Sequence, residues 1–313
     1  MPELPEVQTI ISDLNKKIKS DTITGFWSDW PKAIKNLSID KFTKEIKGRK
    51  ILGARRIGKN IFIDLTGDKT IYIHLKMTGH LLVKTRANFQ FLISNFQSNP
   101  NDQISKSKKN NYFNDKVNQY IHHIWYLKSR NTQHETRNKT LEFSDLRKFG
   151  KIIFVDTNKL TEIKEIKSLG IDVMSPEFTQ KFFSDLLEKQ SASRRKKIRD
   201  ILMDQNLISG IGNIYASEIL FEAGIMPARI AKDIKPEEKS KLYNAIKRVF
   251  EKAIKLRGTS DSDYRDTGGA PGNFQKVLKV YRREGQRCRK CGTIVKRIKM
   301  GQRSAFYCPH CQK

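Results

Sequence analysis

The chain has 313 residues, and its 61 Lys and Arg against 33 Asp and Glu give a formal net charge of +28 at pH 7. A positive field of this size attracts polyanions, although charge alone separates DNA only weakly from RNA or a membrane surface. The sequence has no run of 18 apolar residues and no signal-peptide pattern at its start, which excludes a membrane-spanning helix. We therefore expect a cytoplasmic protein, long enough for two or three domains.

The first 85 residues predict a helix followed by strands. Pro5 suits a first helical turn, and apolar residues recur behind it at helical spacing. Residues 61–65 and 71–75 are rich in β-branched side chains, and Gly67-Asp68 between them is a turn signal. Residues 86–120 change character, because they are rich in Asn, Ser, Lys and Gln. We expect a mobile surface insertion there, followed by strands at 121–127 and 151–155.

From residue 157 the pattern is helical. We expect a helix that starts at Ser175-Pro176-Glu177, with Phe178, Phe182 and Leu186 among the apolar residues behind it, and further helices over 198–207, 214–223 and 236–256. Residues 258–272 are rich in glycine and predict a loop. The fold class is therefore α+β and multidomain. The expected domains are a β domain with an N-terminal helix (1–156), a helical domain (157–275) and a zinc hairpin (276–313).

All four cysteines lie in the last 26 residues, as Cys288, Cys291, Cys308 and Cys311. Their spacing, C-x2-C-x16-C-x2-C, brings four thiolates within reach of one tetrahedral Zn²⁺. Two disulfides are the alternative, but they belong to exported domains, for which no signal is present. The zinc would be structural, since four protein ligands leave no open position. The intervening segment has room for two short strands and carries four basic residues, which suits nucleic-acid contact.

A glycine-containing turn at 209–213 joins two of the predicted helices. Gly210 and Gly212 would allow backbone N–H groups to approach a phosphate closely, and the helix that follows would favour an anion at its N-terminus. Asn213 would add a side-chain donor. A plain helix–helix turn is an equally good interpretation of this short motif taken alone.

The N-terminus offers a nucleophile. If Met1 is removed, Pro2 presents a secondary amine that is partly unprotonated near neutral pH and can attack a sugar C1′ to form an iminium. Glu3 and Glu6 are close enough in sequence to transfer protons. Taken alone, this acidic, proline-containing start is more simply explained as a helix cap.

Six segments together resemble the formamidopyrimidine-DNA glycosylase family, bacterial enzymes that remove oxidised purines from DNA. They are PELPEVQT at 2–9, RRIGKNIF at 55–62, HLKMTGHL at 74–81, DLRKFGKI at 145–152, MDQNLISGIGNIYASEILFEAGI at 203–225 and QRSAFYCPHCQ at 302–312. These segments occur in the family's order and cover nearly all of the chain outside about 86–120. The resemblance implies a bifunctional glycosylase and abasic-site lyase of base excision repair, acting as a monomer on damaged double-stranded DNA in the bacterial cytoplasm, with one Zn²⁺.

The resemblance also implies roles for individual residues. Pro2 would be the nucleophile, Glu3 the proton donor and acceptor, and Glu6 a residue that holds the site. Lys59, Asn213 and Arg303 would contact the DNA backbone. A damaged base must leave the stack to be excised, so the side chains matching Met77, Arg147 and Phe149 would fill the vacancy, with the arginine facing the orphaned cytosine. The segment containing Thr259, Ser260, Asp263 and Tyr264 matches the loop that closes over the flipped base.

The sequence departs from the family pattern in three places. Leu146 stands where the family has proline, Arg147-Lys148 replaces a more common Arg-Arg pair, and the 86–120 insertion has no assigned counterpart. Two alternatives remain at this stage. One is the related endonuclease VIII branch, which prefers oxidised pyrimidines; the PELPEV start and the set of gap-filling residues favour the purine branch. The other is a non-catalytic zinc-dependent DNA-binding protein, which the presence of Pro2, Glu3 and Lys59 disfavours.

Overall fold

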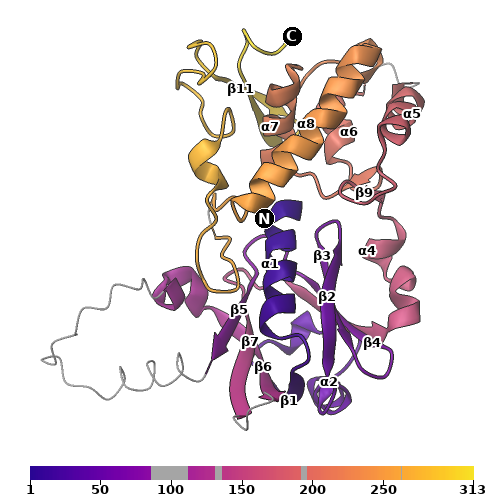
Figure 1. Cartoon of the computed structure of the whole chain (residues 1–313), viewed down its shortest axis with the longest axis vertical. Helices are drawn as coiled ribbons and strands as arrows, with labels where there is room; N and C mark the ends of the chain where they lie inside the picture. Colours follow the sequence, from indigo (N-terminus) through magenta and orange to yellow (C-terminus); the bar gives the residue numbers. More distant parts are fainter. Residues whose placement is uncertain (86–111, 131–135, 192–195, 262) are drawn as a thin grey trace, which may run out of the picture.

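The computed structural model describes the whole chain except residues 86–111, 131–135, 192–195 and 262. Figure 1 shows a lower half built mainly of strands and an upper half built mainly of helices, with the N-terminus between them. The prediction of a mobile insertion concerns residues 86–120, of which 86–111 lie outside the part of the chain that the structure describes. Within the described residues, none of the helices is both long and apolar enough to span a bilayer.

The lower half contains two antiparallel four-stranded sheets. Their orders are β1-β6-β7-β5 and β2-β3-β4-β8. Most of the core of this half consists of aliphatic and aromatic side chains from both sheets and from the N-terminal helix. The predicted strands at 61–65, 71–75, 121–127 and 151–155 are confirmed. The strands are β1 (Thr22–Ser28), β2 (Ile51–Ile57), β3 (Asn60–Leu65), β4 (Lys69–His74), β5 (His80–Thr85), β6 (Ile121–Arg130), β7 (Thr136–Ser144) and β8 (Lys151–Asp156).

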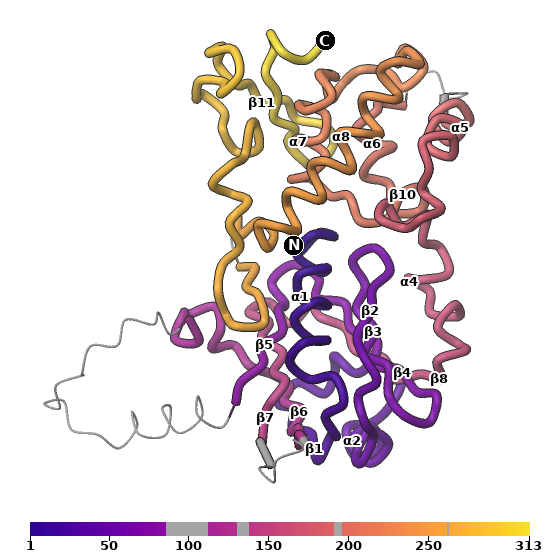
Figure 2. The backbone as a smooth tube through the Cα atoms, viewed as in Figure 1, coloured from indigo at the N-terminus to yellow at the C-terminus, as the bar shows by residue number. Residues whose placement is uncertain are grey.

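Helix α1 (Leu4–Lys17) connects the two halves. Pro5 lies in its first turn as predicted, and Glu3 and Glu6 form a capping box. The inward face of α1 packs in the lower core, whereas Leu4 belongs to the core of the upper half. The first turn of α1 is therefore held between the two halves (Figure 2). Near the opposite end of this half, α2 (Ile39–Ile46) buries Phe42 and Ile46.

The upper half is a helical bundle with a short parallel strand pair. Its helices α5 (Gln180–Ser191), α6 (Ile198–Met203), α7 (Asn213–Ala223) and α8 (Pro236–Lys255) enclose one apolar core. Strands β9 (Ile171–Asp172) and β10 (Ile208–Ser209) pair beneath it, and the short helix α4 (Lys164–Lys167) lies on the connection from β8. Gly224, in the left-handed conformation at φ 75°, ends α7 as predicted.

Two predicted helices have different bounds. The helix expected from Ser175 begins at Gln180, because Ser175 to Thr179 form turns and the Thr179 hydroxyl accepts from the N–H of Phe182. Its buried residues are Phe183 and Leu187, Leu186 packs against the same core, and Phe182 is exposed. The helix expected over 198–207 ends at Met203.

The C-terminal segment forms the expected two-stranded hairpin. Strands β11 (Lys296–Met300) and β12 (Arg303–Tyr307) pair in antiparallel register. Between α8 and this hairpin, residues 258–273 form a loop without helix or strand in its described residues, as predicted. Figure 1 shows this loop descending from the end of α8 to the lower half. The predicted fold class, α+β and multidomain with a β domain, a helical domain and a zinc hairpin, is confirmed, and the β domain is a sandwich of two sheets.

Candidate active site

A cavity of about 280 Å³ lies where the two halves meet. Six separate segments line it: the N-terminus, the β4–β5 turn, the start of α7, the 258–273 loop, the segment at Tyr281 and the tip of the C-terminal hairpin. The lining residues are Met1, Glu3, Met77, Gly212, Asn213, Ile214, Thr259, Asp261, Tyr264, Tyr281 and Arg303. The fold therefore brings six of the predicted site residues to one cavity: Glu3, Met77, Asn213, Thr259, Tyr264 and Arg303.

The Glu3 carboxylate sits at the N-terminus of α7. It accepts hydrogen bonds from the backbone N–H groups of Gly212 (2.8 Å), Ile214 (3.0 Å) and Tyr215 (3.4 Å). The glycine turn does bind an anion, as its sequence indicated, but in this structure the anion is a carboxylate of the chain itself and not a phosphate. Gly212 is required for this approach, since a Cβ there would lie 2.3 Å from Cδ of Glu3.

Glu6 lies beneath Glu3 and joins three segments. Its Oε1 accepts from the Tyr215 hydroxyl at 2.5 Å and from the Thr259 N–H at 2.6 Å, and its Oε2 accepts from the Glu3 N–H at 2.7 Å. Burial, together with the charge of Glu3, raises the pKa of Glu6 to about 7, while the three donors oppose this rise. Glu6 therefore ties the N-terminus to α7 and to the 258–273 loop.

Lys59 lies in the β2–β3 turn and is also buried. Its Nζ donates to the carbonyl of Ile211 at 2.9 Å, so it reaches the turn that precedes α7. Burial lowers the pKa of Lys59, whereas the neighbouring Glu3 carboxylate acts in the opposite direction. The cation lies close to the catalytic candidates at the N-terminus, and it does not line the cavity itself.

Met77, Arg147 and Phe149 meet on the surface beside this cavity. Met77 and Phe149 are 45% and 54% exposed, which is unusual for large apolar side chains. Nη1 of Arg147 lies 3.2 Å from Sδ of Met77, and its guanidinium lies 5.7 Å from the centre of the Phe149 ring. The predicted gap-filling residues thus form one exposed cluster of apolar surface and a guanidinium.

Asp145 holds the turn that carries this cluster. The buried carboxylate accepts from the backbone N–H groups of Phe149 and Gly150 and from the hydroxyl of Thr78. Gly79 and Gly150 let both turns approach Phe143, since a Cβ at either would lie within 2.6 Å of its ring. The β4–β5 turn and the turn before β8 are therefore fixed against each other.

Ser260 and Asp263, the other two residues predicted in the 258–273 loop, are not among the described residues that line the cavity. The Ser260 hydroxyl donates to the Tyr264 carbonyl at 2.7 Å and accepts from the Gly272 N–H at 2.9 Å, which braces the loop across its neck. Asp261, by contrast, lines the cavity. Asp261 also pairs with Arg282 at 2.9 Å.

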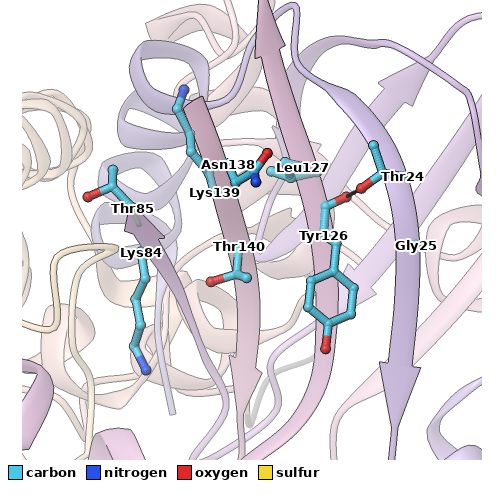
Figure 3. A pocket seen from close by; sticks show the side chains of 9 residues that line it. All are labelled: Thr24, Gly25, Lys84, Thr85, Tyr126, Leu127, Asn138, Lys139 and Thr140. Atoms are coloured by element: carbon cyan, nitrogen blue, oxygen red, sulfur yellow. Dashed lines mark hydrogen bonds between the residues drawn. The ribbon is translucent and has the colours of Figure 1, made fainter. Parts of the chain in front are cut away.

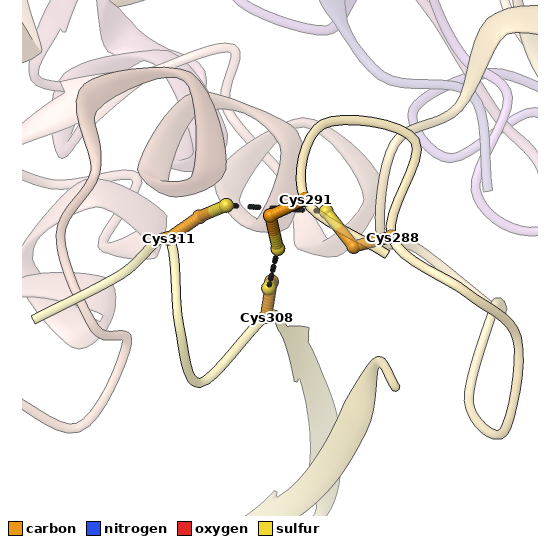
Figure 4. A group of neighbouring side chains, drawn as sticks. All are labelled: Cys288, Cys291, Cys308 and Cys311. Carbon is orange, nitrogen blue, oxygen red and sulfur yellow. Dashed lines mark hydrogen bonds between the residues drawn. The ribbon is translucent and has the colours of Figure 1, made fainter. Parts of the chain in front are cut away.

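The four cysteines converge at the base of the hairpin (Figure 4). Their sulfur atoms all lie within 4.8 Å of one another, and the pairs Cys288–Cys311 and Cys291–Cys308 are 4.0 Å and 3.5 Å apart. Tetrahedral zinc with bonds of about 2.3 Å separates its sulfur ligands by about 3.8 Å. The four thiols fit one structural Zn²⁺, which would fix the strand that begins at Arg303.

A larger cavity, of about 500 Å³, lies on the sheet β1-β6-β7-β5 (Figure 3). Threonine, lysine, asparagine and tyrosine side chains surround it, with no carboxylate, cysteine or histidine among the residues that line it. We place the active site in the smaller cavity because the buried Glu3 carboxylate and the Arg303 guanidinium line it, with Glu6 and Lys59 buried nearby.

The fold and the site together define a class of protein. It has two halves and a zinc hairpin, and residues of the N-terminus, of α7 and of the hairpin meet at a cavity between the halves. Residues 1–152 match the formamidopyrimidine-DNA glycosylase N-terminal domain, residues 169–264 match the H2TH domain of the same enzymes, and residues 285–313 match the zinc finger found in FPG and IleRS. The chain belongs to the formamidopyrimidine-DNA glycosylase family, which comprises bifunctional DNA glycosylases and abasic-site lyases of base excision repair.

Full-length relatives and solved structures agree with this assignment. The formamidopyrimidine-DNA glycosylases of Carboxydothermus hydrogenoformans and Pelotomaculum thermopropionicum are both 36% identical over 313 residues, covering all of this chain and 100% and 99% of the relative. The Lactococcus lactis Fpg in complex with DNA containing an abasic site has a TM-score of 0.77 at 27% identity, with full coverage of both chains. MutM in complex with DNA containing carbocyclic 8-oxo-G has a TM-score of 0.76.

Three residues of the site were not predicted from the sequence. Tyr215 donates to Glu6, and Tyr281 and Asp261 line the cavity. Tyr215 lies within the recognised 203–225 segment but looks like an ordinary buried helix residue. Asp261 lies within the segment matched to the loop over the flipped base, but it was not singled out there. Tyr281 lies between that loop and the cysteines, where no periodicity or spacing signals a role.

Proposed function

We propose that this chain excises oxidised purines from duplex DNA and then cleaves the strand, with the Pro2 nitrogen as nucleophile once Met1 has been removed. The observation that carries the proposal is the position of two carboxylates at the start of α1. Glu3 lines the cavity together with Arg303 and Asn213, and Glu6 is hydrogen-bonded to the backbone N–H of Glu3. Pro2 is buried beside them. A nucleophile, a carboxylate for proton transfer and cationic groups for an anion are thus adjacent.

The reaction proceeds by displacement and elimination. The Pro2 lone pair bonds to the sugar C1′ while the bond from C1′ to the base breaks, and the base leaves with that electron pair and takes up a proton. Glu3 accepts the proton released by the Pro2 nitrogen and delivers it to O4′ as the C1′–O4′ bond opens, which leaves an iminium. Loss of a C2′ proton then breaks the C3′–O3′ bond, a second elimination breaks C5′–O5′, and hydrolysis restores Pro2.

Lys59, Asn213 and Arg303 bind the phosphates next to the damaged nucleotide. In support, Asn213 and Arg303 line the cavity from opposite segments, and Lys59 lies behind them. Phosphate contacts of this kind position the DNA without reading its sequence. The formal charge of +28 would strengthen the initial encounter.

The exposed cluster of Met77, Arg147 and Phe149 fills the gap left by the flipped nucleotide. Its side chains provide an apolar plug, an aromatic wedge and a guanidinium for the opposite cytosine. Thr259, Ser260, Asp263 and Tyr264 belong to the loop that covers the extruded base, and Thr259 and Tyr264 line the cavity where that base would lie.

We further infer that the enzyme works as a monomer on chromosomal DNA in the cytoplasm, with domains at 1–156, 157–275 and 276–313. The cluster of Cys288, Cys291, Cys308 and Cys311 would hold Zn²⁺, which when bound keeps the hairpin folded. Size-exclusion chromatography with and without duplex DNA measures the oligomeric state. A dimeric complex would contradict the monomer.

Borohydride trapping distinguishes this function from its alternatives. The purified protein is incubated with duplexes carrying 8-oxoguanine, an oxidised pyrimidine or an abasic site. We expect a covalent adduct with 8-oxoguanine and with the abasic site. Preferential trapping on the pyrimidine lesion would indicate an endonuclease VIII-like enzyme, and binding without an adduct on any duplex would indicate a non-catalytic DNA-binding protein.

A further inference from the structure

The segment that ends the insertion lies against the 258–273 loop (Figures 1 and 2). Residues 112–119, which form two short 3-10 helices before β6, touch this loop on the side away from α1. We propose that Asp115 and Asn118 of this segment, with Arg265 and Gly269 of the loop, form a loop clamp that positions the loop over the flipped base. The inference deepens the proposed function and rests on it.

An ion pair makes the first contact of the loop clamp. Nε and Nη2 of Arg265 both donate to Oδ2 of Asp115, at 2.9 Å and 2.7 Å. Partial burial raises the pKa of Asp115, but the hydrogen bonds from Arg265 and the Val117 N–H, together with the charge of Arg265, outweigh it and the pKa is lowered overall. Arg265 directly follows Tyr264, which lines the cavity, so the pair acts next to a residue that faces the base.

A buried amide makes the second contact. The Asn118 side chain is 1% exposed, and its Nδ2 donates to the carbonyl of Gly269 at 3.1 Å and to that of Tyr112 at 2.7 Å. Gly269 has φ +79°, and a Cβ there would lie 2.8 Å from this Nδ2. Only glycine allows the loop to approach the amide so closely.

The same amide connects the loop to the turn that carries Met77. Nε2 of His80 lies 2.8 Å from Oδ1 of Asn118, and Nδ1 of His80 lies 3.3 Å from the carbonyl of Thr78. Because Nδ2 of Asn118 donates to two carbonyls, its Oδ1 faces the imidazole, and Nε2–H of His80 donates to that oxygen. Burial lowers the pKa of His80. Asn118 thus lies between the loop that covers the base and the turn that fills its vacancy.

The loop is also anchored to α1, at Asp266 and Thr267. Nη2 of Arg257 donates to Asp13 on α1 at 2.6 Å and to Asp266 at 2.7 Å, and Thr267 donates to Asp13 at 3.0 Å. These bonds hold this part of the loop near α1 whether or not the loop clamp forms. Loss of the loop clamp should therefore move the residues around Tyr264 without releasing the loop as a whole.

Comparing two reactions of the same enzyme shows whether a variant affects the positioning of the base or the stability of the whole protein. Excision of 8-oxoguanine requires a base under the loop, whereas cleavage of a preformed abasic site does not. Both are measured under single-turnover conditions for Asp115→Asn, Arg265→Gln, Asn118→Ala and the charge-reversed double variant D115R/R265D. The matched control is Asp185→Asn, which breaks the exposed pair with Lys181 on α5.

We expect Asp115→Asn and Arg265→Gln each to slow excision about three- to tenfold, because each removes one partner of a partly exposed, charge-assisted pair. Asn118→Ala should slow it more, since buried carbonyls would be left without their donor. Abasic-site cleavage should stay within about twofold of the unmodified protein, and D115R/R265D should recover part of the excision rate.

Unchanged excision in the Asp115 and Arg265 variants would overturn the inference. So would an equal loss of excision and abasic-site cleavage with normal melting temperatures. If the unmodified protein forms no adduct with abasic DNA, the proposed function fails instead, and the two failures are distinguishable. The Asn118→Ala result counts only if this variant keeps the melting temperature of the unmodified protein. If it does not, the Asp115 and Arg265 variants decide the test.

Discussion

Glu3 and Gly212 are joined across the two halves of the molecule, with Oε2 of Glu3 2.8 Å from the backbone nitrogen of Gly212. The bond places a carboxylate on the positive end of α7, where negative charge is stabilised. It also fixes the residue next to Pro2 relative to Asn213, the first residue of that helix. A single side chain therefore positions the proposed nucleophile, Pro2, relative to Asn213, the residue proposed to hydrogen-bond a phosphate.

Gly212→Ala should displace Glu3. The backbone at Gly212 has φ −129°, which any residue adopts, so the added methyl group acts only through its contact at 2.3 Å with Cδ of Glu3. We expect the rates of excision and of abasic-site cleavage to fall together by about 100-fold, because a small misplacement of a reacting group costs about this much in rate. The control is Gly25→Ala, whose Cβ would meet Tyr126 at an ordinary 3.4 Å. Full activity in Gly212→Ala would show that Glu3 need not lie there.

The raised pKa of Glu6 should appear in the pH dependence of stability. A carboxyl whose pKa is about 7 when folded, against 4.5 ordinarily, binds its proton more tightly in the folded state. Its contribution is fully present below pH 4.5 and is lost as pH rises through about 7. Relative to Glu6→Gln, the unmodified protein should therefore lose up to about 3 kcal/mol of unfolding free energy across this interval. Denaturant unfolding at several pH values measures it, and parallel curves for the two proteins would contradict it.

The sequence predicted the elements well where a local pattern sets them. The α1 start at Pro5, the β3–β4 hairpin around Gly67 and the cysteine spacing all reflect local backbone or ligand geometry, and the structure has them. The start of α5 was wrong because Ser175-Pro176-Glu177 is also a good turn sequence. The capping hydroxyl there belongs to Thr179.

The site was predictable only as far as motifs extend. Met77 and Arg147 lie 70 positions apart, and only the resemblance to a family placed them together; the structure brings them to 3.2 Å. Contacts such as Glu6 with Thr259, or Asp115 with Arg265, join positions 253 and 150 residues apart. No periodicity encodes such pairs, since they arise from the packing of the two halves.

Removal of the metal should weaken DNA binding through Arg303. Cys308→Ser, or chelation, is expected to unfold the hairpin and withdraw Arg303, while the β-sandwich domain keeps its circular dichroism signal. Binding and excision should fall together. For each phosphate that the protein no longer neutralises, the negative slope of log K against log salt should also become shallower by about 0.9. A metal-free protein with full activity and an unchanged salt slope would contradict this assignment.

Arg147 and Lys59 should differ in what they contribute. We expect Arg147→Ala to narrow the preference for lesion·C over lesion·A by about 1–3 kcal/mol, because the guanidinium would no longer hydrogen-bond the cytosine. Lys59→Ala should weaken both substrates alike, and the Ile211 carbonyl keeps a donor from Gln205 at 2.7 Å. Single-turnover excision from duplexes that differ only in the opposite base makes the comparison. Retention of the full cytosine preference by Arg147→Ala would show that another residue reads this base.

The nucleophile is tested most directly by extending the chain. A residue before Pro2 turns its nitrogen into an amide, which has no lone pair available for attack on C1′. We compare borohydride trapping on abasic-site DNA for the protein with a free Pro2 amine, the same protein with an uncleaved N-terminal extension, and Pro2→Gly with Met1 removed. The free amine should trap efficiently, Pro2→Gly should trap in part, and the extended protein should bind the DNA without forming an adduct. Efficient trapping by the extended protein would show that Pro2 is not the nucleophile.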